Sequence, residues 1–239
     1  MKCYSRLLCV IGICLIIIAL TGCYPSKLFL GEYQVEPPVF AKPLSDATLK
    51  INACKDNRKS LKNSTNAIFL IFIPFVPYAT DHIQSPEKFV GTLFTVEEYS
   101  ITRDLTMAVV NDLKQSNIFA NVTGTLSLKP TDYDYILSLK LNKATWHRSL
   151  TWYGLSVAGD ILWILGLPCS YGNVELEIGF SLIDAKSEKE IWVKSYKETE
   201  SVIEGEYYNF NTNGRWGPPF KRIMKNLRKD LAECLKKRK

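Results

Sequence analysis

The sequence is poor in the side chains that enzymes and metal sites use. It has two histidines, His82 and His147, and neither accompanies a cysteine pair at the spacing of a zinc site. No nucleophile-elbow motif, phosphate-binding loop or dinucleotide-binding glycine motif occurs. Acids such as Glu175 and Glu177 fall on the polar side of an alternating pattern. We expect water to solvate these carboxylates there, so their presence does not indicate a catalytic role. We therefore predict no catalytic residue, no metal site, no cofactor and no enzymatic activity.

Cysteine is less available for disulfides than its count suggests. Of the seven cysteines, four lie within the first 23 residues. The other three, Cys54, Cys169 and Cys234, are far apart, so at most one disulfide can form among them. Two interpretations stay open, a Cys54–Cys169 disulfide or buried thiols that pack as small apolar side chains.

No apolar run is typical of a membrane-spanning helix, which needs about 20 residues. Residues 7–19 form a charge-free run of 13 residues, and residues 67–78 form one of 12 that two prolines interrupt. Residues 150–168 make a longer run of 19, but it contains Asp160 and three glycines. Each run therefore requires another interpretation.

The first run has the organisation of a secretory signal. Two basic residues precede it, and the tetrapeptide LTGC ends it at Cys23. This order resembles the lipobox of bacterial lipoproteins, in which small residues fit the peptidase and the cysteine thiol carries the lipid. We predict a signal peptide over residues 1–22, cleavage between Gly22 and Cys23, and diacylglycerol and N-acyl (palmitate-type) chains on Cys23. The alternative is an uncleaved membrane anchor.

The residues after the cysteine predict a tether followed by one domain. Residues 24–46 contain four prolines and no sustained periodicity. We assign residues 23–46 to the lipidated N-terminus and tether, and residues 47–239 to a single periplasmic α/β domain. Tyr24, rather than Asp, follows the cysteine, which resembles lipoproteins sorted to the outer membrane. We expect a protein held by its lipid on the periplasmic face of that membrane.

The positive charge is concentrated at the C-terminus. The chain has net charge +6, and residues 221–239 alone hold nine basic and two acidic residues. These basic residues either complement the negative end of a helix dipole or attract anionic lipid or an acidic partner, with Lys225 and Arg228 as contact residues. We expect no nucleic-acid partner for an exported, lipid-anchored chain.

Hydrophobic periodicity predicts the fold class. Apolar and polar residues alternate, as in strands with one covered face, over residues 47–53, 118–123, 135–142, 174–182 and 191–195. Helical stripes occupy residues 96–115, behind a Thr95/Glu98 capping box, and residues 220–234. The order is β-α-β-β-β-β-α with an apolar insertion at 150–168. It predicts an α+β fold, an antiparallel or mixed sheet of about five strands with helices packed on one face.

The apolar insertion predicts a short helix of its own. Asp160 precedes the apolar residues 161–165, and Gly166 follows them, so we expect Asp160 to act as the N-cap. Together with residues 67–78 the insertion has three open interpretations. The segments pack on each other as an extra core layer, form an exposed patch for a protein partner, or touch acyl chains. Trp152 and Trp163 are our candidate contact residues here.

Three segments resemble a known family. IPFVPYATDH (residues 73–82), YGLSVAGDILWILGLP (153–168) and residues 104–122 are similar to a family of uncharacterised bacterial envelope lipoproteins. More distantly, the order of elements over residues 45–200 is similar to small periplasmic α/β lipoproteins such as the curli-secretion lipoprotein, activators of penicillin-binding proteins and transport-auxiliary lipoproteins. The resemblance implies a fold and no catalytic residue, and a shared fold does not fix function.

The features combine into one functional hypothesis. We expect a non-enzymatic, membrane-anchored lipoprotein that acts as an accessory or adaptor subunit of a cell-envelope complex, with an unidentified envelope protein as its partner. One alternative is a lipid-handling transport-auxiliary lipoprotein whose two apolar segments line a groove for acyl chains. Another is a subunit of a multi-copy secretion assembly.

Overall fold

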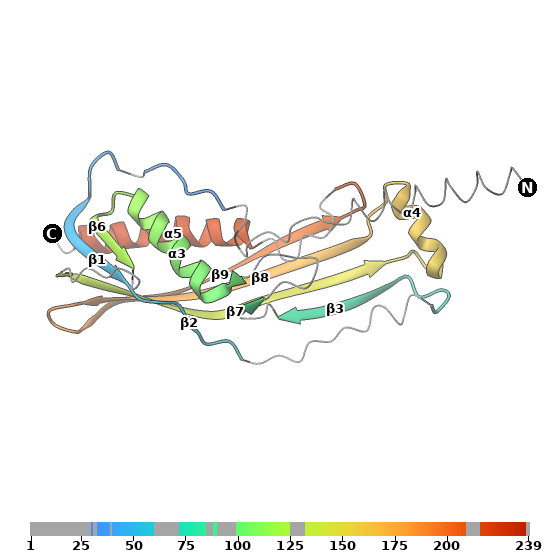
Figure 1. Ribbon diagram of the computed structural model, residues 1–239, viewed down its shortest axis with the longest axis horizontal. Coiled ribbons are helices and arrows are strands. Elements are labelled where there is room, and N and C mark those ends of the chain that lie inside the picture. Colours follow the sequence, from blue (N-terminus) through green and yellow to red (C-terminus); the bar gives the residue numbers. More distant parts are fainter. Residues whose placement is uncertain are drawn as a thin grey trace, which may run out of the picture.

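The fold is an elongated mixed sheet with two long helices towards one end and a short helix at the other, seen in a computed structural model (Figure 1). The structure describes residues 30, 33–38, 40–59, 72–84, 88–89, 99–124, 132–208 and 216–237. The predicted signal peptide, including Gly22, and Cys23 after it lie outside these residues, so cleavage and lipidation stay predictions. Within the described ranges, no helix combines the length and apolarity needed to cross a membrane.

Three long strands form the centre of the sheet. β7 (Tyr135–Thr151) pairs antiparallel with β8 (Ser170–Asp184), which pairs antiparallel with β9 (Glu190–Glu204). The turn between β8 and β9 is held by Asp184, whose Oδ1 accepts hydrogen bonds from two backbone N–H groups at 3.1 and 2.9 Å. This is the predicted hairpin with its polar turn.

Shorter strands line the other edge of β7 in succession. β1 (Ser45–Ile51) and β2 (Lys55–Asp56) pair parallel with β7, and β3 (Tyr78–Gln84) pairs antiparallel with its far half. β6 (Phe119–Gly124) pairs parallel with β1 and completes a seven-stranded sheet. The mixed α+β architecture is therefore as predicted, with more strands than the expected five.

Two short strands lie apart from the main sheet. β4 (Lys88–Phe89) pairs antiparallel with β5 (Tyr99–Ser100). The helix that follows, α3 (Ile101–Gln115), begins later than the predicted residue 96, and its N-cap Ser100 makes no side-chain capping bond. Thr95 and Glu98 of the predicted capping box lie outside the described residues.

Two helices cover one face of the sheet over part of its length (Figure 1). α3 and α5 (Gly217–Lys236) bury their apolar stripes in one core with the inward side chains of β7 and β8. Prolines occupy the first turn of α5, where a missing backbone N–H costs little because that group has no partner within the helix. Beyond these helices β7, β8 and β9 continue towards α4 (Asp160–Ile164) at the far end.

A β-bulge explains why β7 and its pattern differ from the prediction. The strand runs to Thr151 rather than residue 142, and its register with β8 shifts between Leu141 and Lys143. Leu139 and Leu141 are buried before the shift, whereas Ala144 and Trp146 are buried after it. The extra residue at the bulge moves the buried positions of β7 from odd to even residue numbers. The periodicity of the sequence therefore predicts a strand only as far as the bulge.

Part of the predicted tether packs on the helices. Leu30 is buried in the main core. The ring of Tyr33 packs edge-on against Phe220 with centroids 4.8 Å apart, and Glu36 accepts a hydrogen bond from Arg228. Residues 30–38, as far as they are described, therefore belong to the folded body, which shortens the predicted tether.

Candidate functional site

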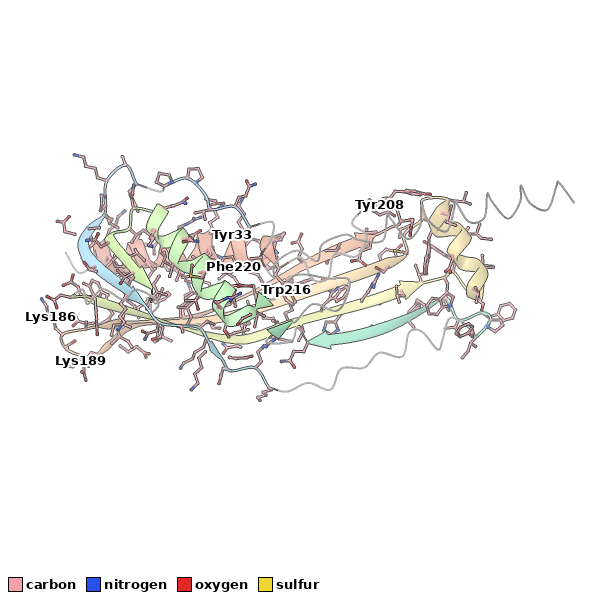
Figure 2. The ribbon with its side chains drawn as sticks, in the orientation of Figure 1. Tyr33, Lys186, Lys189, Tyr208, Trp216 and Phe220 are labelled. Atoms are coloured by element: carbon pink, nitrogen blue, oxygen red, sulfur yellow. The ribbon has the colours of Figure 1, made fainter. Side chains whose placement is uncertain are left out.

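The end of the sheet away from α3 and α5 exposes a cluster of apolar side chains. We call it the apolar tip and define it as residues 72–78, 152–168 and 205–208 (Figures 1 and 2). The most exposed members are Phe75 at 90% and Leu165 at 70%. The full exposed set is Phe72, Ile73, Phe75, Tyr78, Leu155, Val157, Ile161, Ile164, Leu165, Leu167, Tyr207 and Tyr208. An apolar cluster of this kind marks a site of protein or membrane contact.

Backbone hydrogen bonds join the two apolar segments. The N–H of Trp152 and the hydroxyl of Thr151 both donate to the carbonyl of Pro77 at 3.0 Å. The N–H of Phe75 donates to the carbonyl of Gly154 at 3.1 Å. The segments therefore meet, as the interpretation of an extra core layer requires. The apolar core that the two segments share is small, however. Its buried residues are Ala79 and Trp152, with the partly buried Val76 and Leu150 packed against them.

Glycine allows the chain to fold tightly here. Gly154 has φ of +77°, a conformation that other residues rarely adopt, and it faces the backbone of Phe75. A Cβ atom at Gly159 would lie 2.2 Å from the carbonyl oxygen of Trp152. The absence of a side chain at Gly159 lets the 3₁₀ turn η1 (Ser156–Gly159) and α4 fold back over Trp152.

Aromatic side chains satisfy the carbonyls around α4. The hydroxyl of Tyr207 donates to the carbonyl of Ile164 at 2.8 Å, and that of Tyr153 donates to Pro168 at 2.7 Å. The indole N–H of Trp163 donates to the carbonyl of Thr151 at 2.8 Å. Burial is the main cause of a raised pKa of Tyr153, and the nearby Tyr171 and Tyr208 raise it further. The hydroxyl of Tyr153 therefore keeps its proton and stays a donor.

An ion pair with a buried carboxylate and a partly exposed arginine lies at the base of the tip. Arg148 on β7 lies 3.1 Å from the carboxylate of Glu204 at the end of β9, and Glu204 is 1% exposed. Ser170 donates to the same carboxylate and accepts from Arg148 Nε at 3.2 Å. Hydrogen bonds to the remaining polar atoms are what make a buried pair tolerable. This cluster ties β7, β8 and β9 together rather than presenting charge to a ligand.

The predicted contact residues do not form one surface. Trp152 is 1% exposed, so the prediction that its ring faces a partner is wrong. Arg228 is also buried, with its guanidinium 3.0 Å from Asp112 on α3, and its predicted role in attracting lipid or a partner is wrong as well. Trp163 is half-buried in the tip, and Lys225 is exposed on α5 at the other end of the molecule (Figure 1).

Two other expectations need correction. Asp160 is the first residue of α4 rather than its N-cap. The capping position is Gly159, which has no side chain with which to cap the helix. Asp160 Oδ1 is buried without a hydrogen-bond partner among the described residues. Cys54 and Cys169 are both buried and do not form the considered disulfide, so they pack as small side chains. Burial raises the pKa of the Cys169 thiol, which keeps it protonated.

The tip offers apolar contact rather than acid–base chemistry. Its formally charged residues are Asp160 and Glu206, and it contains no lysine or arginine. In the part of the chain that the structure describes, no group of three or more His, Cys, Asp or Glu side chains is arranged to hold a metal ion. The sequence did signal both apolar segments, but their union with Tyr207 and Tyr208 depends on the extension of β9 to Glu204.

Comparisons with known proteins find a weak structural likeness. No protein-family model matches the chain, and no curated protein sequence matches it. Protein XCC0632 from Xanthomonas campestris aligns with TM-score 0.43 and 12% identity over 86% of this chain and 92% of its own. A neuraminyllactose-binding hemagglutinin homolog from Helicobacter pylori gives 0.42 and 9% over 83% and 91%. The PelC dodecamer from Paraburkholderia phytofirmans gives 0.34 and 12% over 71% and 80%. At these values we infer no function from the likeness.

Proposed function

We propose that this protein is a bacterial lipoprotein, anchored through Cys23 on the periplasmic face of the outer membrane, that acts without catalysis as an accessory subunit of a cell-envelope complex. Its apolar tip is the surface that meets an apolar component of the envelope. The lipobox pattern supports the anchor, and the lack of catalytic motifs supports a binding role.

One observation carries the proposal. Large apolar side chains from three separate segments are exposed at a single end of the molecule. The opposite end, around the β8–β9 turn, carries Lys186 and Lys189 instead (Figure 2). Exposing this much apolar surface is unfavourable in water by about 25 cal/mol per Å², so a covered state of the tip is favoured whenever an apolar component is within reach.

Photo-crosslinking in native cells tests the proposal. A photoreactive amino acid replaces Ile161 or Leu165 at the tip, and matched controls replace Lys186 or Lys189 at the other end. We expect strong adducts to one envelope component from the tip positions and none from the controls. Equal labelling from both ends, or none from the tip in cells that contain the protein, would overturn the proposal.

The two alternative functions, a lipid-handling auxiliary and a subunit of a multi-copy assembly, predict different behaviour of the tip. A lipid-handling auxiliary with a groove between the apolar segments would have to open the hydrogen bonds that join Trp152 and Phe75 to the facing segment. A subunit of a multi-copy assembly would self-associate, so its adducts from the tip would be to a second copy. The same crosslinking experiment therefore separates these alternatives from an adaptor.

A further inference from the structure

We infer that the component met by the apolar tip is the acyl-chain layer of the membrane that holds the chain's own lipid anchor. The domain would then be attached to one bilayer at two points, the lipid on Cys23 and the inserted tip. This inference rests on the proposed function and names the partner of the same site.

The residue types at the tip suit lipid better than a protein partner. The most exposed positions are Phe75, Leu165, Tyr207 and Phe72, followed by Ile164, Tyr78 and Ile161, so that five of these seven are aliphatic residues or phenylalanine. Protein interfaces depend on tryptophan, tyrosine and arginine, and leucine and valine are under-represented among their energetically important residues. The tip has no arginine, and its half-buried Trp163 is hydrogen-bonded internally. Aliphatic residues and phenylalanine are the side chains that a bilayer interior accepts most readily.

The backbone of the tip is prepared for a medium without water. In hydrocarbon each unsatisfied backbone polar group costs several kcal/mol, so carbonyls at a helix end need internal partners. Tyr207 supplies a hydroxyl to the carbonyl of Ile164 at 2.8 Å, and Tyr153 supplies one to Pro168 at 2.7 Å. The tyrosine rings also suit the headgroup level, where aromatic residues with one polar end concentrate.

Chain length allows the anchor and the tip to reach one surface. The N–H of Tyr33 donates to the carbonyl of Leu30 at 2.7 Å, which forms a turn. The ring of Tyr33 packs against Phe220, so this turn lies beside the first part of α5. From Leu30 back to Cys23 the chain spans about 25 Å when extended. Arg222, also early in α5, donates to the carbonyl of Thr199 at 2.6 Å. From Thr199 to Glu204 at the end of β9 the strand advances about 17 Å. The two lengths are comparable.

The charge distribution assigns the contact to the acyl layer rather than to anionic headgroups. The tip carries Asp160 and Glu206 and no basic residue. The basic end of α5 lies towards the opposite end of the molecule from α4 (Figure 1), so it does not face a membrane that the tip enters. Insertion should therefore be independent of the fraction of anionic lipid.

Fluorescence quenching in vesicles tests the inference. The full-length lipidated protein is reconstituted into phosphatidylcholine vesicles that contain acyl-chain quenchers, with a fluorescent amino acid in place of Leu165 or, as the control, Lys189. We expect quenching at 165 and none at 189, with the same result after addition of phosphatidylglycerol. The Ile161→Asp change should weaken quenching at 165 at least about tenfold, because aspartate is disfavoured in hydrocarbon. Val193→Asp, on an exposed valine outside the tip, should not.

The outcomes separate this inference from the proposed function. Absence of quenching at 165 in protein that remains on the vesicles would overturn insertion, and so would quenching that requires anionic lipid. If crosslinks from Ile161 in cells then lead to a protein, the accessory role stands and the partner is not lipid. If the tip gives no crosslinks at all, the proposed function itself fails. Thermal unfolding of the Ile161→Asp protein confirms that the fold is unchanged.

Discussion

The body beneath α3 and α5 buries even charged side chains, whereas the apolar tip exposes large apolar ones. In the body even a charged pair is buried, since Arg228 and Asp112 are 4% and 0% exposed at their side chains. At the tip, Phe75 is 90% exposed. The body has the long helices α3 and α5 as a second layer over the sheet, whereas the helical part of the tip among the described residues is the short turn η1 and the five-residue α4 (Figure 1). Whether an apolar segment is buried here depends on the number of layers above it rather than on its composition.

The largest expected difference between the regions is in packing energy. Phe220 is fully buried, whereas Ile161 is 59% exposed. We expect Phe220→Ala to lower the free energy of unfolding by about 3–5 kcal/mol through lost burial and a cavity, and Ile161→Ala to change it by less than about 0.5 kcal/mol. Urea denaturation of the two variants measures both. A comparable loss for Ile161→Ala would show that the tip is packed in solution.

The buried charge of the body should give the next largest effect. Arg228 donates to both oxygens of Asp112, at 3.1 and 3.0 Å. Arg228→Met leaves that carboxylate buried without its cation, and we expect a loss of about 3 kcal/mol in unfolding free energy. The double variant Arg228→Met/Asp112→Leu should recover part of it, because the apolar pair needs no ionic compensation but the Tyr33 hydroxyl loses the Asp112 acceptor.

An exposed neighbour provides the control for this prediction. Lys221 also pairs with Glu36, at 3.5 Å, but its side chain is about half exposed. Lys221→Met should therefore change stability by less than about 0.5 kcal/mol, as for other surface pairs. If Lys221→Met and Arg228→Met cost the same, burial is not what gives the Arg228 pair its importance.

The smallest effect concerns a carboxylate on β8 between the body and the tip. Burial alone would raise the pKa of Glu175, but hydrogen bonds from Lys143 and Lys197, with their charges, lower it. A lowered folded-state pKa stabilises the fold above the unfolded value of about 4.3, and this contribution is lost as pH falls through the folded value. We expect Glu175→Gln to cost about 0.5 kcal/mol at pH 7 and nothing near pH 2, because the lysines are partly exposed. Urea titrations at both pH values measure it, and a larger cost at low pH would contradict the assignment.

Periodicity predicted the body well. Leu105, Val109 and Leu113 on α3 and the alternation Val174, Leu176, Ile178, Phe180, Leu182 on β8 are buried as expected. These patterns succeed because each element has one covered face. Arg228 was misjudged as a contact residue although it stands four positions after Met224 and one after Leu227, inside the apolar stripe of α5. Its partners Asp112 and Glu36 are distant in sequence, so the pairing itself was not predictable.

The tip was predicted only in its parts. Both apolar segments and the short helix before Gly166 were expected, but not β3, the bulge in β7 or the length of β9. Those features place the segments together at one end and leave most of their side chains uncovered. The extra core layer, which the sequence allowed, is limited to Ala79 and Trp152, because the short helix α4 covers Trp152 and leaves most of the other apolar side chains exposed.

The sequence by itself determined the α+β class, the order of the main strands and the two long helices without β2 to β5, the buried faces of these elements, and the apolar character of the two tip segments. These follow from local periodicity, which each segment carries independently. Only the tertiary structure decided that β7 continues through its bulge, that Trp152 and Arg228 are buried, and that the apolar segments become an exposed tip. Burial is a property of what packs above a residue, and in this chain the covering helices come from remote segments that end before the sheet does.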